Sequence, residues 1–122
     1  MRIVSSKTSG VIDDAIKKGE VILKINSDKQ YKHTLSHHLP ERSYLNGDND
    51  YAQKLVNELS GTGKVLIGKD GKWSHKEWVT ANRTIGTHVN VSDRTETETN
   101  KATIIYSKTG THIFPRKGDV DD

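Results

Sequence analysis

Apolar residues recur at helical spacing in two segments of the chain. The first is Val11–Lys18, in which acidic residues come early and lysines late, an order that complements the helix dipole. The second is Asp50–Leu59, and Gly61 lies just beyond its end. Its apolar stripe consists of Ala52, Leu55, Val56 and Leu59. Both segments are predicted to be helices that bury one face.

Short apolar runs and alternating patterns indicate strands elsewhere. Asp70-Gly71 separates two of them and favours a tight hairpin turn, because both residues accept positive φ angles. The predicted strands are Val21–Ile25, Val65–Ile67, Trp73–Thr80, Ile85–Val91, Lys101–Ser107 and Thr111–Pro115. Helices precede most strands, so we predict an α+β fold, with two N-terminal helices packed on a curved four- to five-stranded antiparallel sheet.

Residues 27–47 interrupt this regularity. They are rich in His, Ser, Asn and Gly and contain Pro40, so we predict a long irregular segment. Long loops in compact domains are often functional. The chain of 122 residues shows no internal repeat, which predicts one domain over residues 1–122 with a frayed acidic tail at 118–122.

The composition excludes several kinds of chemistry. The chain has no cysteine, so it has no disulfide, no thiolate zinc site and no cysteine nucleophile. No apolar run is long enough to cross a bilayer, and residues 1–6 lack the apolar core of a signal peptide. We therefore expect any export signal on another segment or on a separate carrier. A net charge of +3 favours an anionic partner only weakly.

The six histidines are the main candidates for chemistry: His33, His37, His38, His75, His88 and His112. No HxH pair occurs among them, and no carboxylate lies at a ligand-like offset, so we expect no bound metal and no cofactor. Imidazoles titrate near neutrality and can act as general base and general acid.

RNA suits such chemistry, because its ribose 2′-hydroxyl is a nucleophile within the substrate. A nuclease then needs a base, an acid, and cations for the charge that accumulates on the phosphate. Lys32 and Arg42 suit the last task. Four hydroxyl groups could donate hydrogen bonds to the same phosphate, or could instead serve turns and the sheet: those of Ser43, Thr99, Tyr106 and Ser107.

Several strings in the chain resemble one family. They are Lys29–His33 (KQYKH), Arg42–Leu45 (RSYL), Gly61–Gly63 (GTG), Lys76–Trp78 (KEW), Thr99, and Ile105–Pro115, of which YSKTGTHIFP is the most specific part. Together they resemble the polymorphic toxin type 50 domain over about residues 21–116. That family is similar to the barnase, EndoU and colicin group of ribonucleases.

The resemblance implies two helices on an antiparallel sheet and metal-independent cleavage of RNA to a 2′,3′-cyclic phosphate; the sequence leaves the target open among tRNA, messenger RNA and general RNA. It implies that the catalytic residues are Lys32, His33, Arg42, Tyr106 and His112, and that Ser43, Thr99 and Ser107 bind substrate. We expect His33 and His112 to share the acid and base roles, and the sequence does not assign which is which.

The chain departs from the family pattern between residues 34 and 41, where it reads TLSHHLPE. His37 and His38 lie in this stretch. They are candidates for binding substrate at the edge of the cleft, and the alternative is that both lie on the loop surface.

Two other functions stay open. A deoxyribonuclease on the same scaffold would need a water nucleophile and usually a metal. An inactive, phage-associated module would bind nucleic acid without turnover. For the toxin, the family implies a cognate immunity protein, which we expect to present an acidic surface. We otherwise expect a monomer, secreted or injected as an effector that acts in the target-cell cytoplasm.

Overall fold

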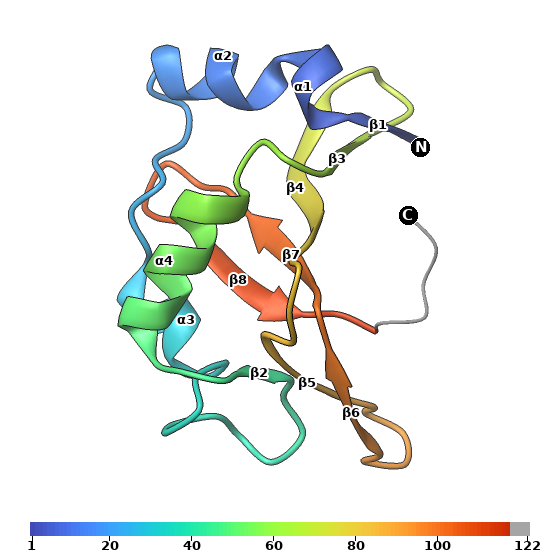
Figure 1. The fold of residues 1–122 in the computed structure, drawn as a ribbon. Coiled ribbons are helices and arrows are strands. Elements are labelled where there is room, and N and C mark those ends of the chain that lie inside the picture. The colour runs from blue at the N-terminus through green and yellow to red at the C-terminus, as the bar shows by residue number, and fades with distance from the viewer. Residues whose placement is uncertain (118–122) are drawn as a thin grey trace.

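The structure is a computed structural model that describes residues 1–117 (Figure 1). In this part of the chain helices and strands alternate irregularly. In chain order they are β1 (Arg2–Ser5), α1 (Ser6–Ser9), α2 (Val11–Lys17), α3 (Ser27–Tyr31), β2 (Tyr44–Leu45), α4 (Asn49–Leu59), β3 (Lys64–Ile67), β4 (Trp73–Thr80), β5 (Gly86–Val89), β6 (Glu96–Thr99), β7 (Lys101–Ile105) and β8 (His112–Pro115).

Five strands form the larger sheet, in the order β1-β3-β4-β7-β8, and every neighbouring pair is antiparallel. The β3–β4 hairpin turns at Gly71, whose φ of 79° is the positive value expected for this turn. A bulge then shifts the register of β4, and His75 lies within it at a φ of 67°. A second sheet contains β2, β5 and β6 in the order β2-β5-β6.

Helix α4 supplies much of the core. Its stripe Ala52, Leu55, Val56 and Leu59 is buried and joins the same apolar cluster as Ile104 and Ile113. Ile104 and Ile113 are directly paired across β7 and β8, so their side chains point to the same face of the sheet. Residues on either side of them in sequence therefore point to the opposite, outer face.

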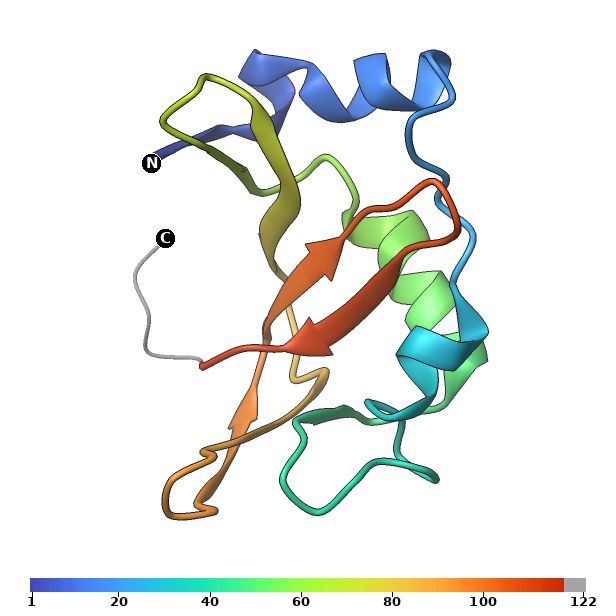
Figure 2. The same cartoon turned by 180° about the vertical axis from the view of Figure 1, so that it is seen from behind.

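Helix α3 lies beside β8, which is an edge strand of the larger sheet. Figures 1 and 2 show α3 next to α4, with the loop that follows α3 running below them to β2. This arrangement brings the start of the predicted irregular segment against the last strand of the chain.

The α+β class is confirmed, as are both predicted helices and the Asp70-Gly71 hairpin. The larger sheet has five strands, at the upper end of the predicted range. The structure has four helices in its described residues rather than two, because the short helices α1 and α3 also form.

Two predictions about local structure were wrong. Val21–Ile25 is not a strand: it makes only isolated bridges, from Ile22 to Ser107 and from Ile25 to Thr111. Residues 27–47 are not wholly irregular, since they contain α3 and β2. Strands β1 and β6 were not predicted because their sequences are mostly polar or lie at the chain end. The expected frayed tail at 118–122 lies outside the described residues.

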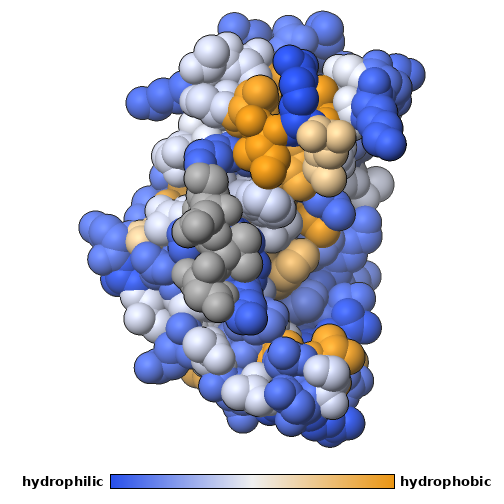
Figure 3. All heavy atoms as spheres, turned by 90° about the vertical axis from the view of Figure 1, so that its right-hand side faces the viewer, coloured by the Kyte–Doolittle hydropathy of each residue, from blue (hydrophilic) through white to orange (hydrophobic). Residues whose placement is uncertain are grey.

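Figure 3 shows the side of the molecule that lies on the right in Figure 1. Hydrophilic residues cover most of it, and an apolar patch lies in its upper part, toward the first strand. Met1 and Ile3, at the start of the chain, are among the exposed apolar residues.

Candidate functional site

Two histidines from opposite ends of the chain meet beside β8. His33 follows α3 and His112 begins β8, and their ring centroids lie 6.4 Å apart with the planes only 13° from parallel. This distance is too long for a hydrogen bond between the rings. The structure therefore brings together the two histidines that the sequence analysis singled out, and their roles as acid and base stay a prediction.

The ring of His33 has a defined orientation. Its Nδ1 lies 2.8 Å from the carbonyl oxygen of Ser43, and because a carbonyl only accepts, Nδ1 carries the proton and donates. Its backbone is held too, since its N–H donates to Gln30 and its carbonyl accepts from Leu45. In the neutral ring Nε2 is therefore the unprotonated nitrogen, which can accept a proton.

His112 lies on the outer face of the larger sheet. It is paired with Ile105, next to the core-facing pair Ile104 and Ile113. Phe114, two residues further along the same face, contacts both imidazoles, with centroids 5.1 Å from His33 and 6.0 Å from His112. The sequence analysis quoted Phe114 only within a motif and did not identify it as part of the site.

Burial makes both imidazoles less basic. It lowers the pKa of His112 to about 4, and the charges of His33, Lys29 and Lys32 contribute to the shift. Burial also lowers the pKa of His33, against the opposing effect of the Ser43 hydrogen bond. The Nδ1 atom of His112 is buried and has no hydrogen-bond partner among the described residues. Both rings are therefore neutral at neutral pH in the free protein.

Three cations act electrostatically on the pair. Lys29 and Lys32 act on His112, and Arg42 and Lys32 act on His33, in each case lowering the pKa through like charge. Lys29 and Arg42 are exposed and Lys32 is half-buried. Lys32 and Arg42 were predicted from the sequence. Lys29 was missed, although it lies one helical turn before Lys32 and so on the same side of α3.

Tyr106 occupies a different place. Its side chain is buried on the core side of the sheet, where its hydroxyl donates to Glu77 at 2.6 Å and lies 2.8 Å from the hydroxyl of Ser60. Burial and the negative charge of Glu77 raise the pKa of Tyr106 well above its usual range. The structure thus engages Tyr106 in an internal network and does not bring its hydroxyl beside the histidines.

Glu77 is the centre of that network and was not singled out from the sequence. Its carboxylate is fully buried and also accepts hydrogen bonds from the Ser6 hydroxyl and from the backbone N–H groups of Gly61 and Gly63. All four partners are donors, which compensates for the burial of the charge. The GTG and KEW motifs therefore meet at one buried carboxylate.

The other predicted hydroxyls have internal partners. That of Ser43 accepts from the N–H of Val89, while its carbonyl holds His33. That of Ser107 lies 3.1 Å from the Thr109 hydroxyl in the turn before β8. Of these, Ser43 alone directly contacts a histidine of the pair among the described residues.

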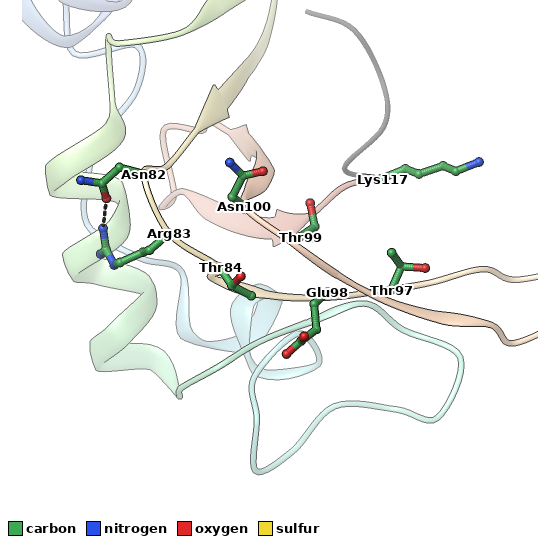
Figure 4. A pocket seen from close by; sticks show the side chains of 8 residues that line it. All are labelled: Asn82, Arg83, Thr84, Thr97, Glu98, Thr99, Asn100 and Lys117. Carbon is green, nitrogen blue, oxygen red and sulfur yellow. Dashed lines mark hydrogen bonds between the residues drawn. The ribbon is translucent and has the colours of Figure 1, made fainter.

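Thr99 is buried and its hydroxyl accepts from the N–H of Lys101. It lines a separate pocket of about 580 Å³ between the β4–β5 loop and β6 (Figure 4). No histidine lines this pocket, so the structure does not bring Thr99 to the pair. The lining residues are Asn82, Arg83, Thr84, Thr97, Glu98, Thr99, Asn100 and Lys117.

His37 and His38 each stack on a tyrosine. The ring of His37 lies 4.1 Å from that of Tyr31, and the ring of His38 lies 3.8 Å from that of Tyr44. His37 is exposed and His38 is half-buried. Neither shows a ring contact with His33 or His112, so their role in binding substrate stays a prediction.

Within residues 1–117, no group of three or more His, Asp or Glu side chains is arranged to hold a metal ion. In the same range no helix has the length and apolar character needed to cross a membrane.

The fold and the site define a small mixed α+β domain in which a histidine pair lies under the electrostatic influence of three cations. Comparison with known families is more specific, because residues 25–115 match the family model described as bacterial toxin 50. The match covers most of the chain, including α3 and β8, so the chain belongs to the bacterial toxin 50 family, one of the polymorphic-toxin families. No curated protein matches the chain.

Proposed function

We propose that this toxin domain is a metal-independent endoribonuclease that cleaves RNA by transesterification. One observation carries the proposal: two nearly parallel imidazoles, 6.4 Å apart, lie among the cations Lys29, Lys32 and Arg42. General acid–base catalysis needs two such groups, and the cations would stabilise the charge that develops on the phosphate. Membership in a toxin family supports a destructive activity of this kind.

In the proposed reaction His33 is the base. Its Nε2, unprotonated because Nδ1 donates to Ser43, takes the proton of the ribose 2′-hydroxyl. The 2′-oxygen attacks the phosphorus, and the bond from phosphorus to the 5′-oxygen breaks. Protonated His112 gives its proton to that leaving oxygen. The products are a 2′,3′-cyclic phosphate and a free 5′-hydroxyl.

His112 must be protonated for this step, although its pKa in the free protein is about 4. A bound phosphate supplies the missing interaction, because a negative charge beside an imidazole favours its protonated form. Substrate would thus charge His112 on binding. Lys32 and Arg42 would contact the non-bridging oxygens, as expected from the sequence, and Lys29 joins them.

The test is cleavage of total tRNA and of duplex DNA by the purified chain, with and without a chelator. We expect chelator-insensitive cleavage of RNA that leaves cyclic phosphate ends. His33→Ala and His112→Ala should each lower the rate by about 10²–10⁴-fold, with unchanged circular dichroism spectra. His88→Ala, a half-buried histidine on β5, is the control and should retain the wild-type rate.

Wild-type rates in His112→Ala would contradict the assignment. Chelator-sensitive cleavage of DNA would instead indicate a deoxyribonuclease on the same scaffold, and salt-dependent binding without turnover would indicate a binding module.

We further propose that the domain is delivered as a secreted effector and that the producing cell protects itself with an immunity protein. An acidic surface that covers Lys29, Lys32 and Arg42 would complement the charge of the site. Block of RNA cleavage by the separately purified immunity protein tests this pairing.

A further inference from the structure

Strand β8 carries His112 and Phe114 and lies at the edge of the larger sheet. An edge strand has backbone groups that point away from the sheet and need partners. At Ile113 the partner is a side chain. The amide of Gln30 donates through Nε2 to the Ile113 carbonyl at 2.8 Å, and its Oε1 accepts from the Ile113 N–H at 2.7 Å. Gln30 is fully buried.

Both hydrogen bonds of this amide end on a single residue. Gln30 therefore pairs with Ile113 as one residue of a neighbouring strand would, and a shift of α3 by even one residue along β8 would break both bonds. Ile113 lies between His112 and Phe114, whose side chains point to the opposite face. The amide of Gln30 thus fixes the position of α3 along β8, relative to the side chains of His112 and Phe114.

Helix α3 depends on such contacts. It has five residues, too few to be stable alone. Its first end is fixed by Asn26, whose side chain accepts from Lys29 N–H and whose own N–H donates to Thr111. At its other end the ring of His33 is oriented by Ser43. Gln30 lies one turn before His33, so its hydrogen bonds to β8 also fix where the imidazole of His33 lies relative to that strand.

We infer that Gln30 is a positioning residue: its buried amide clamps α3 to Ile113 and thereby sets the place of His33 against His112 and Phe114. The clamp deepens the proposed function, and only the kinetic part of its test rests on that function.

The first experiment needs no catalysis. In Gln30→Met the side chain keeps its bulk and loses both hydrogen bonds. We expect the nuclear Overhauser contacts between the rings of His33 and Phe114, whose centroids are 5.1 Å apart, to be lost or strongly weakened. The pKa of His33, followed by NMR titration, should rise toward its ordinary value as the ring leaves its buried place.

Gln53 provides the matched control. Its side-chain amide also makes two backbone hydrogen bonds, accepting from Ile25 N–H at 2.8 Å and donating to the Leu23 carbonyl at 3.0 Å. Gln53→Met should keep the contact between His33 and Phe114 and the pKa of His33. If Gln30→Met keeps them as well, or if both variants lose them equally, the clamp is overturned.

Gln30→Glu covers the case in which Gln30→Met does not fold. A protonated carboxyl group can accept from Ile113 N–H and donate to its carbonyl, whereas the ionised group only accepts. We expect the contact between His33 and Phe114 at acidic pH and its loss as the carboxyl ionises. A contact that persists in the ionised form would overturn the inference.

The kinetic readout is single-turnover cleavage at saturating RNA. We expect Gln30→Met to lower the rate by about 10- to 100-fold, because small displacements of a catalytic group are costly, with RNA affinity changed less than about threefold. An unchanged rate in Gln30→Met would contradict the clamp. If the wild-type chain does not cleave RNA, the proposed function fails, while the NMR result still decides on the clamp.

Discussion

His33 and His112 occupy an environment that disfavours their charged forms. Burial is the largest cause for both, and neighbouring cations add to it. A free imidazole in water would be half protonated at a pH of about 6.5, whereas His112 reaches that point only at a pH of about 4. Both imidazoles are therefore neutral at neutral pH in the free protein, and in the proposed mechanism the protonation of His112 depends on bound substrate.

The same property makes stability depend on pH. Below pH 6.5 the unfolded chain binds a proton at residue 112, while the folded chain does not until a pH of about 4. The contribution of His112 to the free energy of unfolding is thus fully present above pH 6.5. It is lost as the pH falls toward 4, and the loss is at most about 3 kcal/mol. His33 acts in the same direction. Urea unfolding at pH 7.5 and pH 4.5 measures the loss.

His112→Asn is the comparison for this measurement, since asparagine is polar and does not titrate. We expect its free energy of unfolding to fall less between the two pH values than that of the wild-type chain. Equal losses in both proteins would show that His112 is not the group responsible.

At the level of elements, the buried carboxylate of Glu77 joins four parts of the chain. Glu77 lies on β4, Ser6 begins α1, Gly61 and Gly63 lie between α4 and β3, and Tyr106 follows β7. The backbone at Gly63 packs closely against β4, because a Cβ atom on Gly63 would lie 1.9 Å from the carbonyl oxygen of Trp78. A glycine is therefore required at position 63, where the GTG motif passes β4 beside this carboxylate.

Tyr106→Phe separates the structural from the catalytic interpretation of Tyr106. Removal of the hydroxyl takes one donor from a buried carboxylate, so we expect a loss of about 1–3 kcal/mol in the free energy of unfolding. RNA cleavage at a temperature where the variant is folded should stay within about threefold of wild type. A large fall in the cleavage rate of the folded variant would restore Tyr106 to the catalytic group.

Tyr44→Phe is its control. The hydroxyl of Tyr44 donates to Glu96 in an exposed position at 3.0 Å, where water can replace it. We expect this variant to lose less stability than Tyr106→Phe.

For the whole molecule, the formal net charge of +3 is small. The fold concentrates positive charge locally, since α3 and the loop that follows it place Lys29, Lys32 and Arg42 around the histidine pair. Affinity for a polyanion should therefore depend on these few residues more than on the overall charge, and it should decrease with salt.

Binding of a single-stranded DNA oligonucleotide tests this point, because DNA lacks the 2′-hydroxyl and is bound without cleavage by the proposed mechanism. We expect Lys32→Ala to weaken binding and to lower the slope of log K against log salt by about 1. Lys54→Ala, an exposed lysine on α4, should leave the slope unchanged. The same decrease in both variants would argue against a localised site.

The sequence by itself determined the elements whose signals are local. Helices α2 and α4, the Asp70-Gly71 hairpin and strands β4, β7 and β8 follow from periodicity and turn residues, within one or two residues at most ends. Motif resemblance also identified His33, His112, Lys32 and Arg42, and the family match confirms the family.

Only the tertiary structure decided which of the polar candidates lie together. Tyr106 and His112 belong to the same motif, yet alternation along the strands sends them to opposite faces, one toward Glu77 and the other toward His33. Gln30 pairs with Ile113 across 83 residues of sequence. Such partners depend on the packing of distant segments, which no local pattern in the chain encodes.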